Sequence, residues 1–96
     1  MTRKFDFHTD AAHGWLKVNT KDLHDISLSI ADFSSYSYRD GAWLYLEEDL
    51  DAGTFIKQWE TMRGEFEVRH VDDGYDSPIR QLNRLPSLAR MSSINI

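Results

Sequence analysis

Residues 51–71, DAGTFIKQWETMRGEFEVRHV, place a helical pattern directly before a strand pattern. In the first part, apolar side chains recur at the spacing of one helix face, which predicts an amphipathic helix. This stripe consists of Ala52, Phe55, Ile56, Trp59 and Met62. From residue 65 to residue 71 charged and apolar side chains alternate, which predicts a strand with Phe66 and Val68 facing inward. The stretch therefore predicts a helix that packs on a sheet.

The ends of this helix carry residues with known capping preferences. Asp49 or Asp51 is expected to cap its start through the side-chain carboxylate. Gly64 stands where a residue in the left-handed conformation commonly ends a helix. Gly53 lowers helix stability by about 1 kcal/mol relative to alanine, so we expect the first turn to fray.

Two hairpins are predicted before this helix. Residues 5–7 and 15–18 alternate between apolar and polar side chains, and the turn formers of residues 8–14 connect them. Residues 33–38 alternate aromatic and small polar side chains and lead through an Asp-Gly turn to a return strand over residues 42–46. Because Leu44 and Leu46 share one face of that strand and Trp43 and Tyr45 share the other, the strand is expected to be central or to expose an aromatic face.

Shorter helical segments complete the predicted order. Thr20 is expected to cap a helix over residues 21–25, with Leu23 and Ile26 facing inward. Ser77 and Pro78 form a typical helix start. The fold class predicted is α+β, a small single domain with a mostly antiparallel sheet of about five strands and two helices in the order β-β-α-β-β-α-β. The domain is expected to span residues 1–85, and residues 86–96 are expected to form a poorly ordered C-terminal tail unless a partner holds it.

Length and composition narrow the class of protein. The chain has 96 residues, a formal net charge of -5 and no cysteine, which predicts one acidic domain without disulfides or thiolate metal sites. No apolar run approaches the roughly 20 residues of a membrane-spanning helix, and residues 1–6 are not followed by the apolar stretch of a signal peptide. We therefore expect a cytoplasmic protein with no membrane partner. An acidic chain also lacks the cations that non-specific nucleic-acid binding requires.

The acidic residues are concentrated in the middle of the sequence. Residues 47–76 contain ten acidic and three basic side chains, whereas residues 77–96 contain three arginines and no acid. Such a block is either a solvated face or a surface for a basic partner. Its densest part lies beside the aromatic hairpin, and tyrosine and tryptophan dominate interface hot spots. The predicted partner-binding residues are Tyr36, Tyr38, Asp40, Trp43, Tyr45, Glu47, Glu48, Asp49 and Asp51.

One cluster has the residue types of a metal site. His8, Asp10 and His13 lie on a single predicted loop, and imidazole and carboxylate ligands suit zinc. Their spacing matches no standard zinc signature, and a loop in which Asp10 binds backbone amides explains the same residues. The sequence shows no phosphate-binding glycine loop and no recognised nucleophile context. We therefore predict no cofactor and no catalytic residue, with a metal-dependent enzyme or metal-binding domain as the alternative.

Four segments together resemble a family of small orphan proteins. They are FHTDAAHGWLKV at residues 7–18, SYSY at residues 35–38, YLEEDLDA at residues 45–52 and SPIR at residues 77–80. The resemblance is to proteins common in phages, plasmids and integrated elements of bacteria. It implies a non-enzymatic inhibitor of a host defence system, of the anti-CRISPR kind, whose partner is a nucleic-acid-binding complex of the bacterial host. An accessory protein of conjugation or phage assembly, forming a homodimer or larger oligomer through the aromatic hairpin, is a further alternative.

Overall fold

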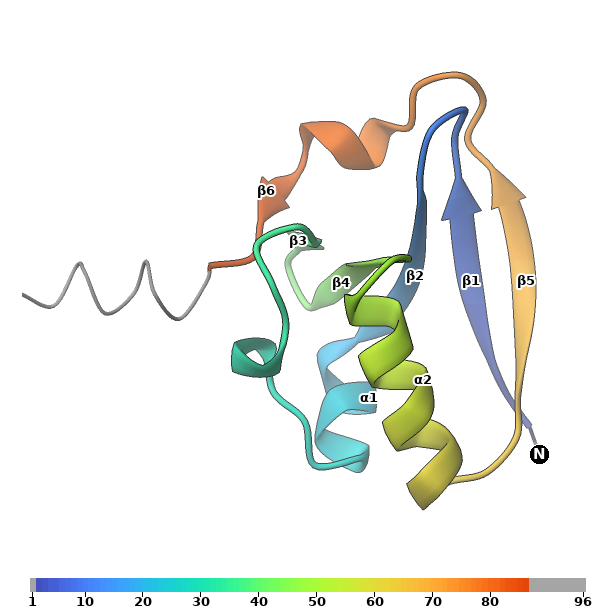
Figure 1. Cartoon of the computed structure of the whole chain (residues 1–96), viewed down its shortest axis with the longest axis vertical. Helices are drawn as coiled ribbons and strands as arrows, with labels where there is room; N and C mark the ends of the chain where they lie inside the picture. Colours follow the sequence, from blue (N-terminus) through green and yellow to red (C-terminus); the bar gives the residue numbers. More distant parts are fainter. Residues whose placement is uncertain (1, 87–96) are drawn as a thin grey trace, which may run out of the picture.

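The computed structural model describes residues 2–86, which form one six-stranded sheet with two α-helices packed on the same face (Figure 1). The strands are β1 (Arg3–Thr9), β2 (Gly14–Asn19), β3 (Tyr38–Asp40), β4 (Trp43–Glu47), β5 (Phe66–Asp72) and β6 (Asn83–Arg84). The helices are α1 (Thr20–Asp25) and α2 (Asp51–Met62), with 3-10 turns η1 (Ile30–Asp32) and η2 (Pro78–Gln81).

The strand order in the sheet is β5-β1-β2-β4-β3-β6. Every neighbouring pair is antiparallel except β1 and β5, which run parallel because α2 connects β4 to the far edge of the sheet. The predicted α+β class, with a mostly antiparallel sheet and two helices, is therefore confirmed. The structure has six strands where about five were expected, since two residues beside β3 form the short strand β6.

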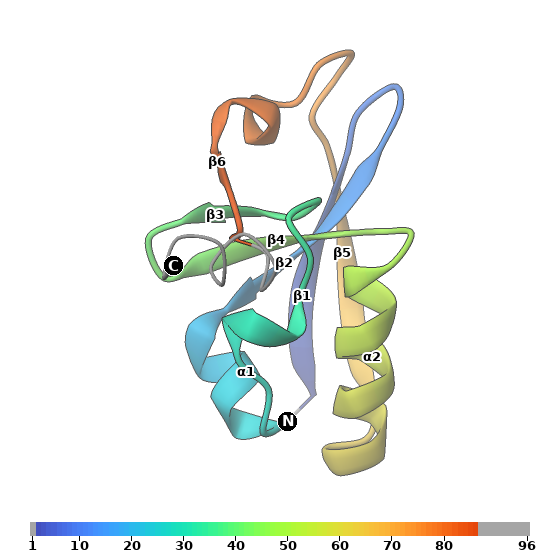
Figure 2. The same ribbon diagram turned by 60° about the vertical axis from the view of Figure 1, so that its left-hand side comes forward.

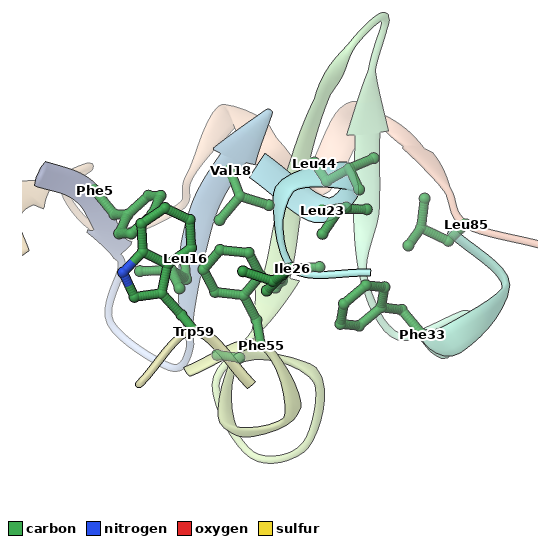
Figure 3. Packing of buried hydrophobic residues seen from close by; sticks show 12 residues of the cluster. Phe5, Leu16, Val18, Leu23, Ile26, Phe33, Leu44, Phe55, Trp59 and Leu85 are labelled. Atoms are coloured by element: carbon green, nitrogen blue, oxygen red, sulfur yellow. The ribbon is translucent and has the colours of Figure 1, made fainter. Parts of the chain in front are cut away.

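The main core lies between the sheet and the two helices. At one end of this core the ring centroid of Phe5 lies 5.3 Å from that of Phe55 and 5.0 Å from that of Trp59, both in edge-to-face geometry (Figure 3). Leu23 and Ile26 of the α1 region are almost fully buried in the middle of the cluster, and Phe33 and Leu85 lie at its other end (Figure 3). Each such large apolar side chain stabilises the fold by roughly 1.5–3 kcal/mol relative to an exposed position. The predicted helical stripe is confirmed for Ala52, Phe55, Ile56 and Trp59, whereas Met62 at its end is 48% exposed, and the predicted inward-facing Leu23 and Ile26 are confirmed.

The opposite face of the sheet carries a second, smaller apolar cluster. Trp15, Tyr38 and Tyr45 project from β2, β3 and β4, and Ile79 of η2 covers them. From η2 the chain descends to β6 at the sheet edge (Figure 2). Leu85 then enters the main core, where it is fully buried. The segment from η2 to Leu85 thus covers the β3 edge of the sheet on both faces.

Three local predictions differ from the structure. Residues 33–37 form bends and turns instead of a strand, and only Tyr38 begins β3. The cap of α1 is Asn19, whose side chain accepts from the Lys21 amide, so the helix starts one residue before the predicted position. Val68 is 41% exposed although it shares the helical face of the sheet with Phe5, because it lies on the edge strand β5.

The start of α2 also differs from the prediction. Its N-cap is Leu50, and no side chain caps it there. The amide of Leu50 instead donates to a carboxylate oxygen of Glu47 at 2.7 Å. Gly64 has a φ of 90°, as expected for the residue that ends the helix in the left-handed conformation. Of the predicted C-terminal tail, residues 87–96 lie outside the described residues.

Candidate protein-binding surface

A buried carboxylate organises the region where the sequence predicted a binding surface. Asp51 is only 2% exposed, and its carboxylate accepts hydrogen bonds from the amide and hydroxyl of Ser34 and from the hydroxyl of Ser37. The Ser37 hydroxyl in turn accepts from the amide of Glu47 at 3.0 Å. Asp51 therefore does not contact a partner directly. It fixes the turn at residues 34–37 against the end of β4 and the start of α2.

The turn at residues 48–50, between β4 and α2, presents the acidic side chains. Glu48 and Asp49 are exposed, and neither forms an ion pair with a basic side chain of residues 2–86. Leu50 is 55% exposed beside them. The amide of Glu48 donates to the carbonyl oxygen of Gly14, which holds this turn against the β1–β2 loop. An exposed apolar side chain therefore lies next to two carboxylates that no cation of residues 2–86 neutralises through an ion pair.

Tyr36 completes this surface from the neighbouring turn. It is 64% exposed, and its amide donates to the hydroxyl of Ser34, the residue that Asp51 holds in place. A shallow hollow of about 120 Å³ lies beside it. The residues lining the hollow are His13, Trp15, Tyr36, Tyr38, Glu47, Arg80 and Arg84. We define the acidic–aromatic surface as Tyr36, Glu47, Glu48, Asp49 and Leu50.

Other predicted binding residues lie elsewhere. Tyr38 and Tyr45 are 7% and 9% exposed and belong to the second apolar cluster. Burial raises the pKa of the Tyr45 hydroxyl. Asp40 and Trp43 are exposed but pair with each other at the far end of the β3–β4 hairpin. Glu47 lies four positions after Trp43 along β4, a distance of about 13 Å, so Asp40 and Trp43 form a separate surface.

Asp10, one of the three residues of the alternative metal-site interpretation, fastens the β1–β2 loop through hydrogen bonds. Its carboxylate, which has no exposed area, accepts from Arg80 at 2.6 and 3.0 Å and from the amides of Ala12, His13 and Ser77. The hydrogen bonds from Arg80 hold the pKa of Asp10 far below its usual value, against the opposing effect of burial, and the three amides lower it further. Asp10 thus fastens η2 to the β1–β2 loop.

The two histidines of that cluster point to different partners. His8 contacts Asp73 through Nδ1 at 3.1 Å, and Asp73 also accepts from the Ser77 hydroxyl at 2.6 Å. His13 is exposed, and its ring lies 6.2 Å from that of Trp15. Within residues 2–86 no three histidine, aspartate or glutamate side chains are grouped as a cation site. The interpretation of Asp10 as a loop carboxylate agrees with the structure.

Sequence reasoning missed the contacts that bring the C-terminal segment to this region. Arg80 lies over the Trp15 ring at 5.4 Å from its centroid, and Arg84 lies over the Tyr38 ring at 5.0 Å. Arg80 and Asp10 are 70 positions apart, so no local pattern connects them. The only sequence signal was the helix start at Ser77, whose hydroxyl accepts from the Ile79 amide as expected.

Comparisons with known proteins found no similar protein from which a function could be inferred. No family model, no curated protein and no solved structure matches the chain. Within residues 2–86, none of the helices combines the length and the apolar character needed to cross a membrane.

Proposed function

We propose that this protein is a non-enzymatic inhibitor encoded by a bacterial mobile element, acting in the cytoplasm of the host. Its partner is a nucleic-acid-binding defence complex such as a CRISPR effector. The protein binds through the acidic–aromatic surface, whose carboxylates face a basic groove of the partner. The observation that carries the proposal is the exposed Leu50 beside Glu48 and Asp49, with the exposed Tyr36 on the turn that Asp51 and Ser37 join to theirs.

The chemistry of the surface favours a basic protein partner. Exposed aromatic and apolar side chains provide contact area at the centre of an interface, and tyrosine is enriched at energetic hot spots. Glu48 and Asp49 add charge that accelerates encounter with a cationic groove and selects against acidic partners. Because phosphates repel these carboxylates, the protein itself is expected to bind neither DNA nor RNA.

The internal hydrogen bonds support a preorganised surface. The turn bearing Tyr36 and the turn bearing Glu48 are joined through Asp51 and Ser37, so their relative position does not have to be ordered on binding. Preorganisation reduces the entropic cost of association. His8 and Ser77 each contact Asp73, but no hydrogen bond joins His8 to Ser77 in the described residues. These three side chains therefore do not form the hydrogen-bonded chain of a catalytic site, and they are compatible with a binding role.

The test is charge reversal at two positions with a matched control. The variant Glu48→Lys with Asp49→Lys is compared with Asp25→Lys and Glu60→Lys, which changes the net charge equally at exposed positions on α1 and α2. Binding to purified CRISPR effector complexes of bacterial hosts is measured by calorimetry, and inhibition by the target-DNA binding of each complex. Melting curves establish that both variants are folded.

The proposal predicts a loss of binding for the first variant and wild-type binding for the control. We expect Tyr36→Ala to weaken the same complex by roughly 2 kcal/mol, as for an interface hot spot. Inhibition that survives the reversal at positions 48 and 49 in a folded protein contradicts the acidic–aromatic surface. Direct binding of DNA or RNA by the wild-type protein contradicts the proposed mechanism.

A further inference from the structure

The strand β5 forms one end of the sheet in the described residues, and its outer edge lacks a neighbouring strand. It is seven residues long and mostly exposed, with the sequence FEVRHVD. An edge of this length presents unsatisfied backbone amide and carbonyl groups, for which another strand is the natural partner. It lies at the end of the sheet opposite to β3 and β6 (Figure 1).

The side chains of β5 alternate between the two faces of the sheet. Phe66 faces the helices, where its ring lies 5.8 Å from that of Phe5, and Val68 shares that face. Glu67 and Arg69 occupy the opposite face, where Arg69 donates to both oxygens of Asp6. His70 follows Phe66 and Val68 on the helical face, and Val71 follows Glu67 and Arg69 on the other. Any strand added beside β5 must therefore match Phe66 and Val68 on one face and two opposite charges on the other.

The sequence of β5 is complementary to itself in one antiparallel register. When two copies pair about a two-fold axis at Val68, Glu67 of each copy lies opposite Arg69 of the other. Sliding one strand past the other by two residues moves the axis to position 67 or 69 and places two Glu67 or two Arg69 side chains opposite each other, and like charges in that position are destabilising. Registers that differ by a single residue bring the apolar row of one copy to the charged face of the other.

Both charged side chains are available for this pairing. The Glu67 side chain is 61% exposed, and its one ion pair within residues 2–86 is with Lys4, at 3.9 Å. The Arg69 side chain is 65% exposed and uses Nε and Nη2 for Asp6, so Nη1 has no partner among residues 2–86. Nη1 of Arg69 can therefore donate to a second carboxylate while Nε and Nη2 keep their hydrogen bonds to Asp6.

We propose that the protein forms a homodimer by antiparallel pairing of β5 with β5 of a second copy, in the register centred on Val68. The two sheets become continuous, and the helices of both copies lie on the same side. The interface is isologous, so each copy contributes the same residues. The two acidic–aromatic surfaces then lie towards the outer ends of the dimer. This inference uses none of the residues of those surfaces and does not rest on the proposed function.

The test uses two single charge changes that are complementary to each other. Glu67→Arg places arginine opposite arginine at both charged contacts, and Arg69→Glu places glutamate opposite glutamate. Each variant alone is expected to have a dimer dissociation constant about tenfold or more above that of the wild type, because attractive cross-strand pairs become repulsive. A mixture of the two variants restores opposite charges at every contact and is expected to form a heterodimer.

The readout is the mass in solution, by light scattering and sedimentation over a wide range of protein concentration. The wild type is expected to reach twice the monomer mass of 11.2 kDa. Because Arg69→Glu also removes the intramolecular pair with Asp6, circular dichroism and melting curves must show that each variant is folded. A wild type that stays monomeric, or variants that dimerise as the wild type does, would overturn the proposal.

Cysteine trapping tests the register separately. The chain has no cysteine, so Val68→Cys introduces a single thiol. In the proposed register the two thiols face each other across the axis, with Cβ atoms about 4.5–5.5 Å apart, from which a small shift reaches disulfide geometry. Oxidation is expected to give a covalent dimer. The control is Tyr75→Cys, at an 89% exposed position outside β5. Equal cross-linking of the two variants would contradict the register.

Discussion

Replacing Asp51 by alanine tests whether this carboxylate organises the two turns of the acidic–aromatic surface. The substitution removes the acceptor for the Ser34 amide, the Ser34 hydroxyl and the Ser37 hydroxyl, with donor–acceptor distances of 2.5–3.1 Å. Ser37 has no exposed area, so its hydroxyl loses a partner that water cannot readily replace. The matched control is Asp49→Ala, which removes the same charge two residues away at an exposed position.

The magnitude follows from the number and kind of these hydrogen bonds. A hydrogen bond to a charged group contributes roughly 1.5–3 kcal/mol, and a buried donor without a partner costs about 1–3 kcal/mol. Because the three bonds share one carboxylate, their contributions do not add, and we expect Asp51→Ala to lower the free energy of unfolding by about 3–5 kcal/mol. A domain of this size has a total stability of roughly 5–14 kcal/mol. The loss is therefore a large fraction of the whole.

Urea unfolding followed by tryptophan fluorescence and circular dichroism measures this difference. The midpoint is expected to fall with little change in the m-value, since the surface exposed on unfolding stays the same. Asp49→Ala is expected to lie within about 0.5 kcal/mol of the wild type. Asp51→Asn retains one acceptor oxygen and should be intermediate. A loss below about 1 kcal/mol for Asp51→Ala, or equal losses for Asp51→Ala and Asp49→Ala, would refute the reasoning.

Two further predictions concern the β1–β2 loop. Gly14→Ala should lower stability by about 1–3 kcal/mol in thermal melts, because a Cβ at this position would lie 2.6 Å from Cζ of Phe7. Combining it with Phe7→Leu should recover part of this loss. If the effects of the two substitutions are additive, the steric explanation is wrong. Because the pKa of Asp10 is lowered in the folded state, its contribution to stability is present above the unfolded pKa of about 3.9 and is lost as the pH falls below it. With Asp10→Asn, the urea midpoint should therefore fall less steeply as the pH is lowered. A residual slope should remain from Asp6, whose pKa the Arg69 hydrogen bond lowers. A slope equal to that of the wild type would contradict this role of Asp10.

The elements that the sequence predicted correctly are those defined by local periodicity. The stripe through Phe55 and Trp59 forms the buried face of α2, and Leu44 and Leu46 are buried in the core from β4, an interior strand of the sheet. The α+β class follows from these patterns, because each amphipathic element must bury its apolar face against another. Such predictions need only the spacing of residues within one element.

The turn at residues 34–37 shows why other predictions were wrong. Its alternation of serine and tyrosine is the pattern of a half-buried strand. In the structure Ser34 and Ser37 bind the buried carboxylate of Asp51, which competes with the backbone pairing of a strand. The contact spans 14 to 17 residues and depends on where α2 begins. No pattern within the turn contains that information.

The acidic block of residues 47–76 illustrates the same limit for the candidate site. Sequence alone treats its carboxylates as one face, but several of them have intramolecular roles. Asp51 binds the serines, Asp73 binds His8 and Ser77, and Glu47 accepts from the amide of Leu50. Glu48 and Asp49, by contrast, form no ion pair with a cation of the described residues, and they lie beside the exposed side chain of Leu50. The charge that Glu48 and Asp49 offer to a partner is therefore much smaller than the net charge of the block, and it lies on a turn that Glu47 and Asp51 help to hold in place.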